Sequence, residues 1–589
     1  MKKIILKISF LLVLVAIISC NNDYLERYPL DKISNQTFWN SETDLESFNN
    51  SIYMLASNDA NYWFMMGYNN GAFAGAFNAL PYLDEMTDNM APKHSRHSGF
   101  ARIRSGKQPV PTEPVSGGWY WDLLRSCNVF LQNYQKAEIP GSIKNQYAGE
   151  VKLFRAWFYH DKVKRFGDVP WVAQPLNIDD PILFGERNSR EMIMDSVLAD
   201  INFACEYLPE SWNSEAPGRM NKWCALAVKS RICLYEGTFR KYHQKPNAEM
   251  WLEEAVDAAR QVIDGGQFSL YNTGDTENDY RYSFHQSDLS GNPEVIYWRK
   301  YITGIVALDF QRYFSEYHGG ATKDLVEDYL CTDGNPISLS PLYQGDNQIE
   351  DIFVNRDPRL RQTILHPDDK TKLRYNKGDV LPYPRLEGMD GGLQSTTGYH
   401  VVKFYDADQH MRGFERDETA AITLRYAEVL LNYAEALAEL GEITQQDINI
   451  SVNALRDRVG MPHLDMNNIA VDPKYAASGI SPLLVEIRRE RRLELFAEGF
   501  RYDDLIRWKQ GKKLEQPDLG MRWEETQKTR FPKASVQGIT DPSTGKTYIN
   551  VYSGTDFATP VFDENKHYLW PIPTSVLSQN PNLGQNPGW

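Results

Sequence analysis

Several carboxylates that could serve as a general acid and a general base lie close together late in the chain. Glu494, Glu498, Asp503 and Asp504 follow one another within a short stretch, and a pair of carboxyl groups can hydrolyse a glycosidic bond. Arginines such as Arg491 are interspersed among them. A neighbouring guanidinium lowers the pKa of a carboxyl group, which is the wrong direction for a general acid at neutral pH. The spacing therefore favours structural ion pairs over catalysis.

The same stretch has a charge pattern that requires partners from elsewhere in the chain. Glu490, Glu494 and Glu498 recur every four residues, and Arg488 and Arg492 form a shorter series. Like charges at this spacing repel each other on an isolated helix. We therefore expect neighbouring elements to supply the opposite charges, so that the stretch forms a charged joint in a helical core.

Two other groups have residue types that bind metals. Asp84, Glu85 and Asp88 could ligate calcium, but their spacing lacks the glycine and the distal glutamate of an EF-hand. His94 and His97 are three residues apart with no third ligand in view, and a solvated loop explains them better. The sequence has no P-loop, no GxGxxG after a strand, no GxSxG and no HExxH. We expect no cofactor and no metal, and we assign no catalytic residue.

Helical periodicity dominates the segments that must position these residues. Ser41 is expected to cap the first helix, and Gly499 to end the helix of the charged joint. Trp298 is expected in the core, within one of two strand-like segments, 293–301 and 399–406. Paired helices suggest stacked hairpins, the pair 424–441 and 447–459 resembling a tetratricopeptide unit. Amphipathic patterns predict helices at 119–136, 143–165, 188–207, 220–240, 249–263, 424–441, 447–459, 483–498 and 502–509.

The start of the chain has the features of an exported lipoprotein. Lys2, Lys3 and Lys7 form a positive region, and the apolar run 8–18 is too short to span a bilayer. A small residue then precedes Cys20, as in a bacterial lipobox. Cleavage would leave Cys20 as a lipid-bearing first residue, whereas the alternative is an ordinary signal peptide with an incidental cysteine. No later stretch is long and apolar enough to cross a membrane.

Composition and charge exclude some classes of partner. The chain has 589 residues and a net charge of −15, which loss of the three lysines would lower to −18. Without a basic patch among aromatics, nucleic acid is not expected as a partner. The remaining cysteines form no CxxC pair, so neither a zinc site nor a disulfide framework is implied. Small buried thiols are expected at Cys127, Cys205, Cys224 and Cys233.

Two long regions, 58–116 and 267–415, combine glycine, asparagine and aromatic residues in the manner of functional loops. Sugars present flat apolar faces and hydroxyl edges, so their sites combine exposed aromatic rings with a few polar groups. The alternative for each ring is packing in the core. On position and residue type we predict ligand contacts at Trp63, Tyr68, Tyr280, Tyr282, Tyr313 and Tyr317.

Eight segments in order make the whole chain resemble the SusD/RagB family of Bacteroidetes outer-membrane lipoproteins. They are Cys20 with DYLERYPLD, YLDEMTDNM, NPEVIYWRKY, NRDPRLRQTIL, LRYAEVLLNYAEALAELG, ALRDRVGMP, EIRRERRLELFAEGFRYDDLIRW, and YLWPIP with NPNLGQNPGW. The resemblance implies a mainly α fold of four tetratricopeptide-like hairpins, with long loops and small β elements on the ligand face. It divides the chain into a signal peptide (1–19), an N-terminal region (20–266) and a C-terminal region (267–589). The last comprises a loop and strand insert (267–415), helical repeats (417–511) and a C-terminal strap (512–589).

The resemblance also implies an activity and partners. It implies a non-enzymatic lipoprotein, anchored through Cys20 on the exterior of the outer membrane, that binds glycans for a SusC-like TonB-dependent transporter. Three alternatives remain: capture of peptides or another nutrient, a helical-repeat scaffold of the outer membrane, and a lipoprotein glycosidase. A scaffold does not need long aromatic loops, and a glycosidase needs carboxylates outside arginine-rich surroundings.

Overall fold

Helices are the main regular structure of the described residues, and the strands among them are few and short. The computed structural model describes residues 38–58, 80–93, 98–212, 218–308, 310–311, 319–369, 374–375, 379–380, 384–389, 394–413 and 416–589. The longer helices are α2 (Glu42–Asn58), α4 (Asp122–Asn133), α5 (Gly141–Phe166), α6 (Arg190–Tyr207), α7 (Lys222–Tyr242), α8 (Ala248–Asp264), α14 (Tyr426–Leu440) and α17 (Pro482–Glu494). The shorter ones include η4 (Leu80–Met86), α3 (Ser98–Arg104), η7 (Pro181–Phe184), α9 (Asp279–Tyr282), α11 (Lys323–Asp328), α12 (Pro358–Thr363), α13 (Ala407–Met411), α15 (Gln445–Ile450), α16 (Val452–Arg458), α18 (Arg501–Arg507), α19 (Glu525–Arg530), α20 (Thr574–Gln579) and η12 (Pro581–Leu583).

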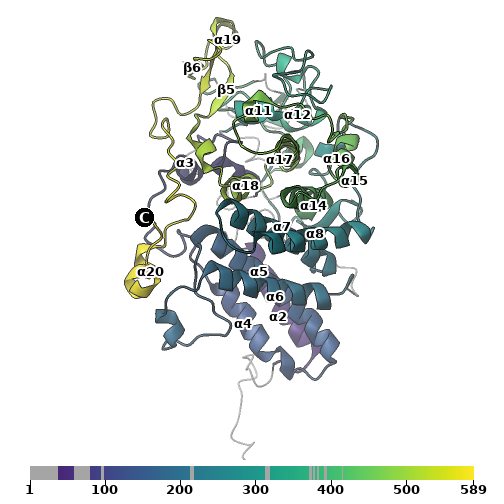
Figure 1. Ribbon diagram of the computed structural model, residues 1–589, viewed down its shortest axis with the longest axis vertical. Coiled ribbons are helices and arrows are strands. Elements are labelled where there is room, and N and C mark those ends of the chain that lie inside the picture. Colours follow the sequence, from purple (N-terminus) through teal and green to yellow (C-terminus); the bar gives the residue numbers. More distant parts are fainter. Residues whose placement is uncertain are drawn as a thin grey trace, which may run out of the picture.

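Consecutive helices pack side by side in layers. Figure 1 shows α2 and α4 at the bottom, then α5 with α6, then α7 with α8, and above them α14, α17 and α18. The predicted mainly α fold and the succession of paired helices are confirmed. The comparison of these pairs with tetratricopeptide units stays a prediction. Ser41 caps α2 as expected, because its Oγ accepts from the Asp44 N–H at 3.3 Å and its own N–H donates to Asp44 Oδ2 at 2.9 Å.

The strands form three small antiparallel sheets. Strand β1 (Val295–Arg299) pairs with β4 (Ala421–Arg425), and β2 (Arg374–Tyr375) pairs with β3 (Asp379–Val380). The third sheet has the order β5-β7-β6, formed by Leu519–Arg522, Thr547–Asn550 and Gly538–Thr540. Trp298 of β1 is 9% exposed and packs with Leu289 and Ala420, which confirms its predicted place in the core.

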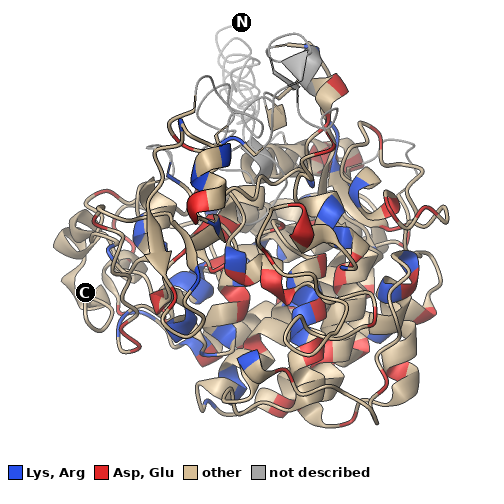
Figure 2. Cartoon of the chain, turned by 90° about the horizontal axis from the view of Figure 1, so that it is seen from above, with Lys and Arg blue, Asp and Glu red and all other residues tan. Residues whose placement is uncertain are grey.

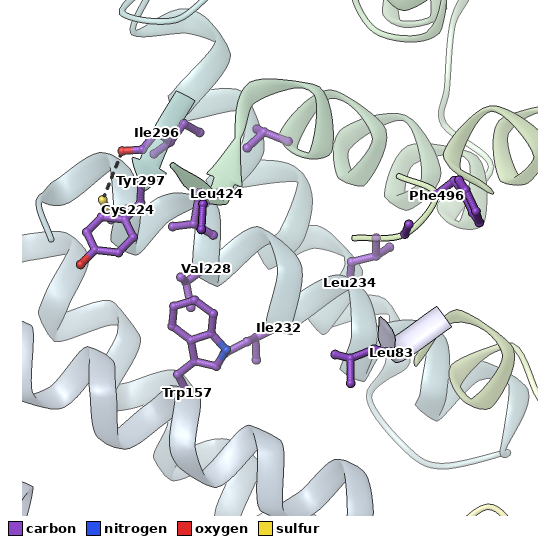
Figure 3. Close-up of a cluster of buried hydrophobic side chains, with 14 of the residues drawn as sticks. Leu83, Trp157, Cys224, Val228, Ile232, Leu234, Ile296, Tyr297, Leu424 and Phe496 are labelled. Carbon is purple, nitrogen blue, oxygen red and sulfur yellow. Dashed lines mark hydrogen bonds between the residues drawn. The ribbon is translucent and has the colours of Figure 1, made fainter. Parts of the chain in front are cut away.

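The core joins segments that are far apart in the chain. In Figure 3, Trp157 of α5 and Ile232 of α7 lie below the β1–β4 pair, which contributes Tyr297 and Leu424. The Cys224 thiol contacts the Ile296 carbonyl oxygen at 3.8 Å. The five cysteines that the structure describes are all free thiols. Cys127, Cys224, Cys233 and Cys331 are buried as small apolar groups, whereas Cys205, which was expected to be buried, is half-buried.

Three sequence-based boundaries were wrong. Residues 399–406 form no named strand, although Val401 makes an isolated bridge with Ile364. Leu424, predicted in a helix, belongs to β4 because β1 is available to pair with it. The predicted helix 447–459 is broken at Ser451, whose φ of −119° and ψ of −88° separate α15 from α16.

Helix α17 also ends earlier than predicted, at Glu494 rather than next to Gly499. The last carbonyl groups of a helix lack partners within the helix. Here the Glu494 carbonyl accepts from Tyr280 Oη at 2.7 Å and from Arg425 Nη2 at 2.9 Å, and Lys403 Nζ donates to the Phe496 carbonyl at 2.8 Å. Side chains from other elements therefore satisfy the helix end, which the sequence of the helix itself does not reveal.

The C-terminal strap lies along one side of the helical layers, as Figure 1 shows in yellow. Asn586 fastens its end, because Nδ2 donates to the Phe166 carbonyl at 3.1 Å and to the Trp570 carbonyl at 2.7 Å. The Trp570 N–H donates to the Arg165 carbonyl at 2.6 Å. The strap thus caps the C-terminal end of α5.

The close packing of α7 on α8 gives a first prediction. A Cβ on Gly237 would lie 2.8 Å from Leu252 Cγ and 3.0 Å from the Leu252 backbone nitrogen. Overpacking of this kind costs about 1–3 kcal/mol, which exceeds the gain of about 1 kcal/mol in helix propensity. We expect Gly237→Ala to lower the free energy of unfolding in urea, whereas Gly99→Ala in α3, where a Cβ meets nothing within 4 Å, should not. Equal stability of the two variants would contradict this account of the helix contact.

Candidate functional site

The carboxylates that first suggested catalysis are ion-pair partners, and all but one are buried or nearly so; Asp503 is half-buried and lies 2.5 Å from Lys164 Nζ. Glu494, at the end of α17, is 0% exposed and lies between three arginines from other elements. Arg425 Nη1 lies 2.7 Å from Oε1, while Arg458 Nη2 and Arg359 Nη1 lie 2.6 Å and 3.1 Å from Oε2. The expectation that neighbouring elements supply the opposite charges is confirmed, and Figure 2 shows acidic and basic residues interleaved through the middle of the protein.

The other two members of the glutamate series are held in the same way. Glu490 lies between Arg359 and Arg456, whose nitrogens are 2.5 Å and 3.1 Å from its oxygens. Glu498 accepts from the buried Lys403 at 2.6 Å. The partners come from α12, α16 and the segment that precedes β4, so α17 joins elements that lie far apart in sequence.

These surroundings set the proton affinities of the carboxyl groups. Burial raises the pKa of Glu494, but the guanidiniums of Arg458, Arg425 and Arg359 outweigh burial and hold that pKa well below its usual range. Burial also raises the pKa of Glu498, and its cationic neighbours again lower it overall. A group that stays ionised in this way cannot donate a proton near neutral pH. The arrangement supports structure and gives no candidate general acid.

The opposite face of α17 is held by acidic residues. Arg491 Nε lies 3.0 Å from Asp504 Oδ2 of α18, and its Nη1 donates to Asn432 Oδ1 at 2.8 Å. Arg488 lies 2.8 Å from Glu439 of α14. Asp504 is in the first turn of α18, as predicted, and there it both faces the helix dipole and neutralises Arg491.

The acidic group near residue 84 is also part of the core. Asp88 accepts from Arg501 at 2.7 and 2.8 Å, so two guanidinium nitrogens occupy the oxygens that a calcium ion would need. Asp84 Oδ2 accepts from the Asn89 amide and from the Ala497 N–H. Burial raises the pKa of Asp84 to about 6 in spite of these bonds. Among the described residues, no group of three or more His, Cys, Asp or Glu side chains is arranged to hold a metal ion.

The predicted ligand-contact residues have different positions. Tyr280 is 1% exposed, and its hydroxyl donates to the carbonyl of Glu494, so its assignment to the ligand face was wrong. Tyr282, two residues later on α9, is 53% exposed. The other predicted contacts, and the cysteine predicted to bear lipid, lie outside the described residues: Cys20, Trp63, Tyr68, Tyr313 and Tyr317, together with His94 and His97.

A second tyrosine, which the sequence analysis missed, lies beside Tyr282. The ring of Tyr271 is 5.9 Å from that of Tyr282 with an interplanar angle of 32°. The two rings form an aromatic pair, the kind of group on which a sugar ring stacks. Tyr271 lies in the same polar loop region that the sequence marked as functional. Tyr271 itself is half-buried, so Tyr282 is the exposed member of the pair.

The loop that carries this pair is fastened to the charged joint. Asp279 accepts from the N–H and the Oγ1 of Thr273 at 2.6 and 2.7 Å, which closes the turn between the two tyrosines. Arg281 donates through Nε to the Val402 carbonyl at 2.9 Å, and the Tyr271 N–H donates to Glu294 at 3.0 Å. Because Glu294 is itself an ion-pair partner of Arg425, the buried charges position the exposed rings.

Comparisons with known proteins agree with this architecture. A family model described as "SusD family" matches residues 313–589, and another, described as "Starch-binding associating with outer membrane", matches residues 23–234. The chain belongs to the SusD/RagB family. SusD-like protein P2 of Formosa agariphila is 22% identical over 590 residues, with 99% of each chain covered.

Solved structures of the family have the same fold. A SusD-like carbohydrate binding protein from Bacteroides fragilis superposes with a TM-score of 0.72 at 22% identity, over 93% of this chain and all of that chain. A second SusD-like protein from Bacteroides fragilis has a TM-score of 0.71 at 26% identity, over 96% of this chain and all of that chain. In the part of the chain that is described, none of the helices combines the length and apolar character needed to cross a bilayer.

The pairing of Arg491 predicts a structural role without a binding role. Asp504 keeps its pair with Arg507 at 2.8 Å when Arg491 is removed, so the cost lies at the low end of that for a broken buried pair, about 3 kcal/mol. We expect Arg491→Ala to lower the free energy of urea unfolding by this amount. Arg530→Ala, which removes an exposed pair with Glu350, should change it by less than about 1 kcal/mol. A folded Arg491→Ala protein of parental stability that had lost ligand binding would contradict the structural assignment.

The buried Glu435 predicts how stability changes in acid. Its carboxylate accepts from Arg507 at 2.5 Å and from Trp508 Nε1 at 2.6 Å. Burial raises the pKa of Glu435, but the guanidinium of Arg507, followed by those of Arg491 and Arg488, lowers it from 4.5 to about 2. The unfolded chain therefore takes up this proton first, so the stabilisation is present above pH 4.5 and is lost as the pH falls towards 2.

Urea unfolding of Glu435→Gln at pH 7, 5, 4 and 3.5 tests this dependence. The variant should be less stable than the parent by about 3 kcal/mol at pH 7, by nearly as much at pH 5, and by progressively less at pH 4 and 3.5. Glu350→Gln, at an exposed pair, should show a small difference at every pH. A Glu435→Gln difference that does not change with pH would show that the side chain stabilises the fold through packing instead of charge.

Proposed function

We propose that the protein is a non-enzymatic glycan-binding lipoprotein that delivers nutrient to a SusC-like TonB-dependent transporter. Its lipid is carried by Cys20, and its body faces the exterior of the outer membrane. Membership of the SusD/RagB family is the observation that supports this function best. The family model for residues 23–234 is described as starch-binding and associating with the outer membrane, and one structural neighbour is described as a carbohydrate binding protein.

The paired state of the acidic residues supports binding without turnover. Glycoside hydrolysis requires one carboxyl group that is protonated near neutral pH and a second carboxylate nearby. Glu494, Glu498 and Asp504 of the charged joint are bound by guanidiniums in the interior. They are unsuitable for acid catalysis. Asp503, which is half-buried, pairs with Lys164 Nζ at 2.5 Å.

The pair of the half-buried Tyr271 and the exposed Tyr282 is the proposed point of contact with the glycan among the described residues. A sugar ring that stacks on the pair buries apolar surface of both tyrosines, and their hydroxyl groups remain at the edge to accept or donate hydrogen bonds. Asp279 and Arg281 hold α9 in place, so the rings require little ordering when a ligand binds. Trp63, Tyr68, Tyr313 and Tyr317 remain proposed contacts on residue type and position.

Isothermal titration of residues 21–589 with a panel of soluble polysaccharides and a peptide digest tests the function. We expect at least one glycan to bind and none to be shortened, as judged by chromatography after long incubation. Binding of the digest with no glycan bound would move the function to peptide capture. Release of shorter sugars from any bound polymer would overturn the non-enzymatic assignment.

The tyrosine pair is tested with the glycan that binds. Tyr282→Ala should weaken binding about tenfold, because an aromatic contact contributes on the order of 1.4 kcal/mol. The control is Tyr207→Ala, which removes another partly exposed tyrosine, whose ring packs against Phe203 of α6 with centroids 4.5 Å apart and an interplanar angle of 40°. An affinity that Tyr282→Ala leaves unchanged would place the glycan elsewhere while leaving the family function intact.

A further inference from the structure

A cavity of about 610 Å³ lies between the start of α4, the loop 170–185 and the C-terminal helices α20 and η12. Its lining residues are remote in sequence from Tyr271 and Tyr282. Its wall includes Trp121 just before α4, Phe184 of η7 and Val576 of α20. The volume is in the range of sites that enclose a ligand. A cavity of this volume has room for several large side chains at once.

The mouth of this cavity exposes an unusual group of apolar side chains. Ile178 is 83% exposed, Phe184 54%, Leu183 42% and Ile182 38%, and all four line the cavity. Single exposed apolar residues are common on protein surfaces, but a contiguous group beside a cavity marks a binding surface. We call these four residues with the cavity the apolar mouth.

Hydrogen bonds from Asn128, Arg125 and Asn580 hold the loop of the apolar mouth against the rest of the protein. Asn128 Nδ2 donates to the Val172 carbonyl at 2.8 Å, and Arg125 Nη1 donates to the Leu176 carbonyl at 2.8 Å. On the other arm of the loop, Asn580 Nδ2 donates to the carbonyl of Gly185 at 2.8 Å. The loop backbone is thus tied to the body through its carbonyl groups, while its apolar side chains stay in water.

Two features indicate what fills the mouth. Asp122 and Arg125 line the cavity, and Asp179 and Asp180 lie between the exposed Ile178 and Ile182 in the loop, so these carboxylates outnumber the guanidinium of Arg125 and the surroundings are acidic overall. An acidic rim repels anionic lipid and favours a basic partner. The exposed lining is mostly aliphatic, and the buried amides of Asn128 and Asn580 are already bonded to backbone, so a sugar finds fewer polar partners here than apolar ones.

We infer that the apolar mouth binds a segment of another protein that inserts large apolar side chains and carries lysine or arginine beside them. The cavity takes the apolar side chains, and the rim carboxylates pair with the basic flanks. Binding removes the four exposed side chains from water, which supplies the driving force. This surface is independent of which nutrient the tyrosine pair contacts.

The test uses a labelled peptide with one tryptophan and three leucines at its centre and two lysines at each end. Fluorescence anisotropy follows its titration with residues 21–589. Two comparison peptides replace the lysines by glutamates or the apolar residues by serines. We expect both replacements to weaken binding at least tenfold. Ile178→Ser and Phe184→Ser should each weaken binding of the lysine peptide at least tenfold, whereas Val471→Ser, at a residue 58% exposed and elsewhere, should not.

Each other outcome overturns the proposal. No binding, equal binding of the three peptides, or binding that both mouth variants leave unchanged would remove the protein partner. Displacement of the peptide by a soluble glycan would make the cavity a sugar site. Sedimentation that shows self-association of the parent, lost in Ile178→Ser, would assign the mouth to a second copy of the chain. Thermal unfolding of the variants, expected to match the parent because both side chains are exposed, confirms that they are folded.

Discussion

Helix α17 carries arginine and glutamate side chains into the middle of the protein, where water cannot screen their charges. Each ion costs several kcal/mol to desolvate, and the cost is recovered only if partners with good geometry surround it. The partners come from β4, α11, α12, α14, α16 and α18, as the pairs of Arg425, Arg492, Arg359, Arg488, Arg458 and Arg491 show. No subset of these elements can satisfy α17 alone. The network therefore specifies one mutual arrangement of elements that lie as many as 164 residues apart in sequence.

The same network reaches the surface. Glu294 joins Arg425 to the backbone of Tyr271, and the carbonyl at the end of α17 accepts from Tyr280, the neighbour of Arg281 on α9. The exposed Tyr282 is thus one residue from a side chain anchored in the body and two from a ring buried in it. Rigid placement of a few aromatic rings lowers the ordering cost of ligand binding. The burial of charge and the placement of the proposed glycan contact therefore depend on one set of contacts.

The two surfaces that bear on function have different physical character. The tyrosine pair is aromatic and partly exposed, which suits a sugar ring that stacks on it with its hydroxyl groups in water. The apolar mouth is concave, mostly aliphatic and rimmed by carboxylates, which suits side chains that enter and lose contact with water. The first is positioned by the charged joint and the second by Asn128, Arg125 and Asn580. The proposed glycan contact and the proposed protein contact are therefore made by separate surfaces of the chain.

The sequence by itself determined the helical class, most of the helix positions and the need of α17 for external charges, because periodicity and like-charge spacing are local properties. It also marked Tyr282 and the loop around it. Only the tertiary structure decided that Tyr280 is buried while Tyr282 is exposed, that α17 stops at Glu494, and that Leu424 pairs in a strand. Each depends on groups supplied by distant segments: the carbonyl of Glu494, Lys403 and Arg425, and β1. Exposure and helix ends are properties of the packed chain, since neighbours that are remote in sequence decide which groups remain in water.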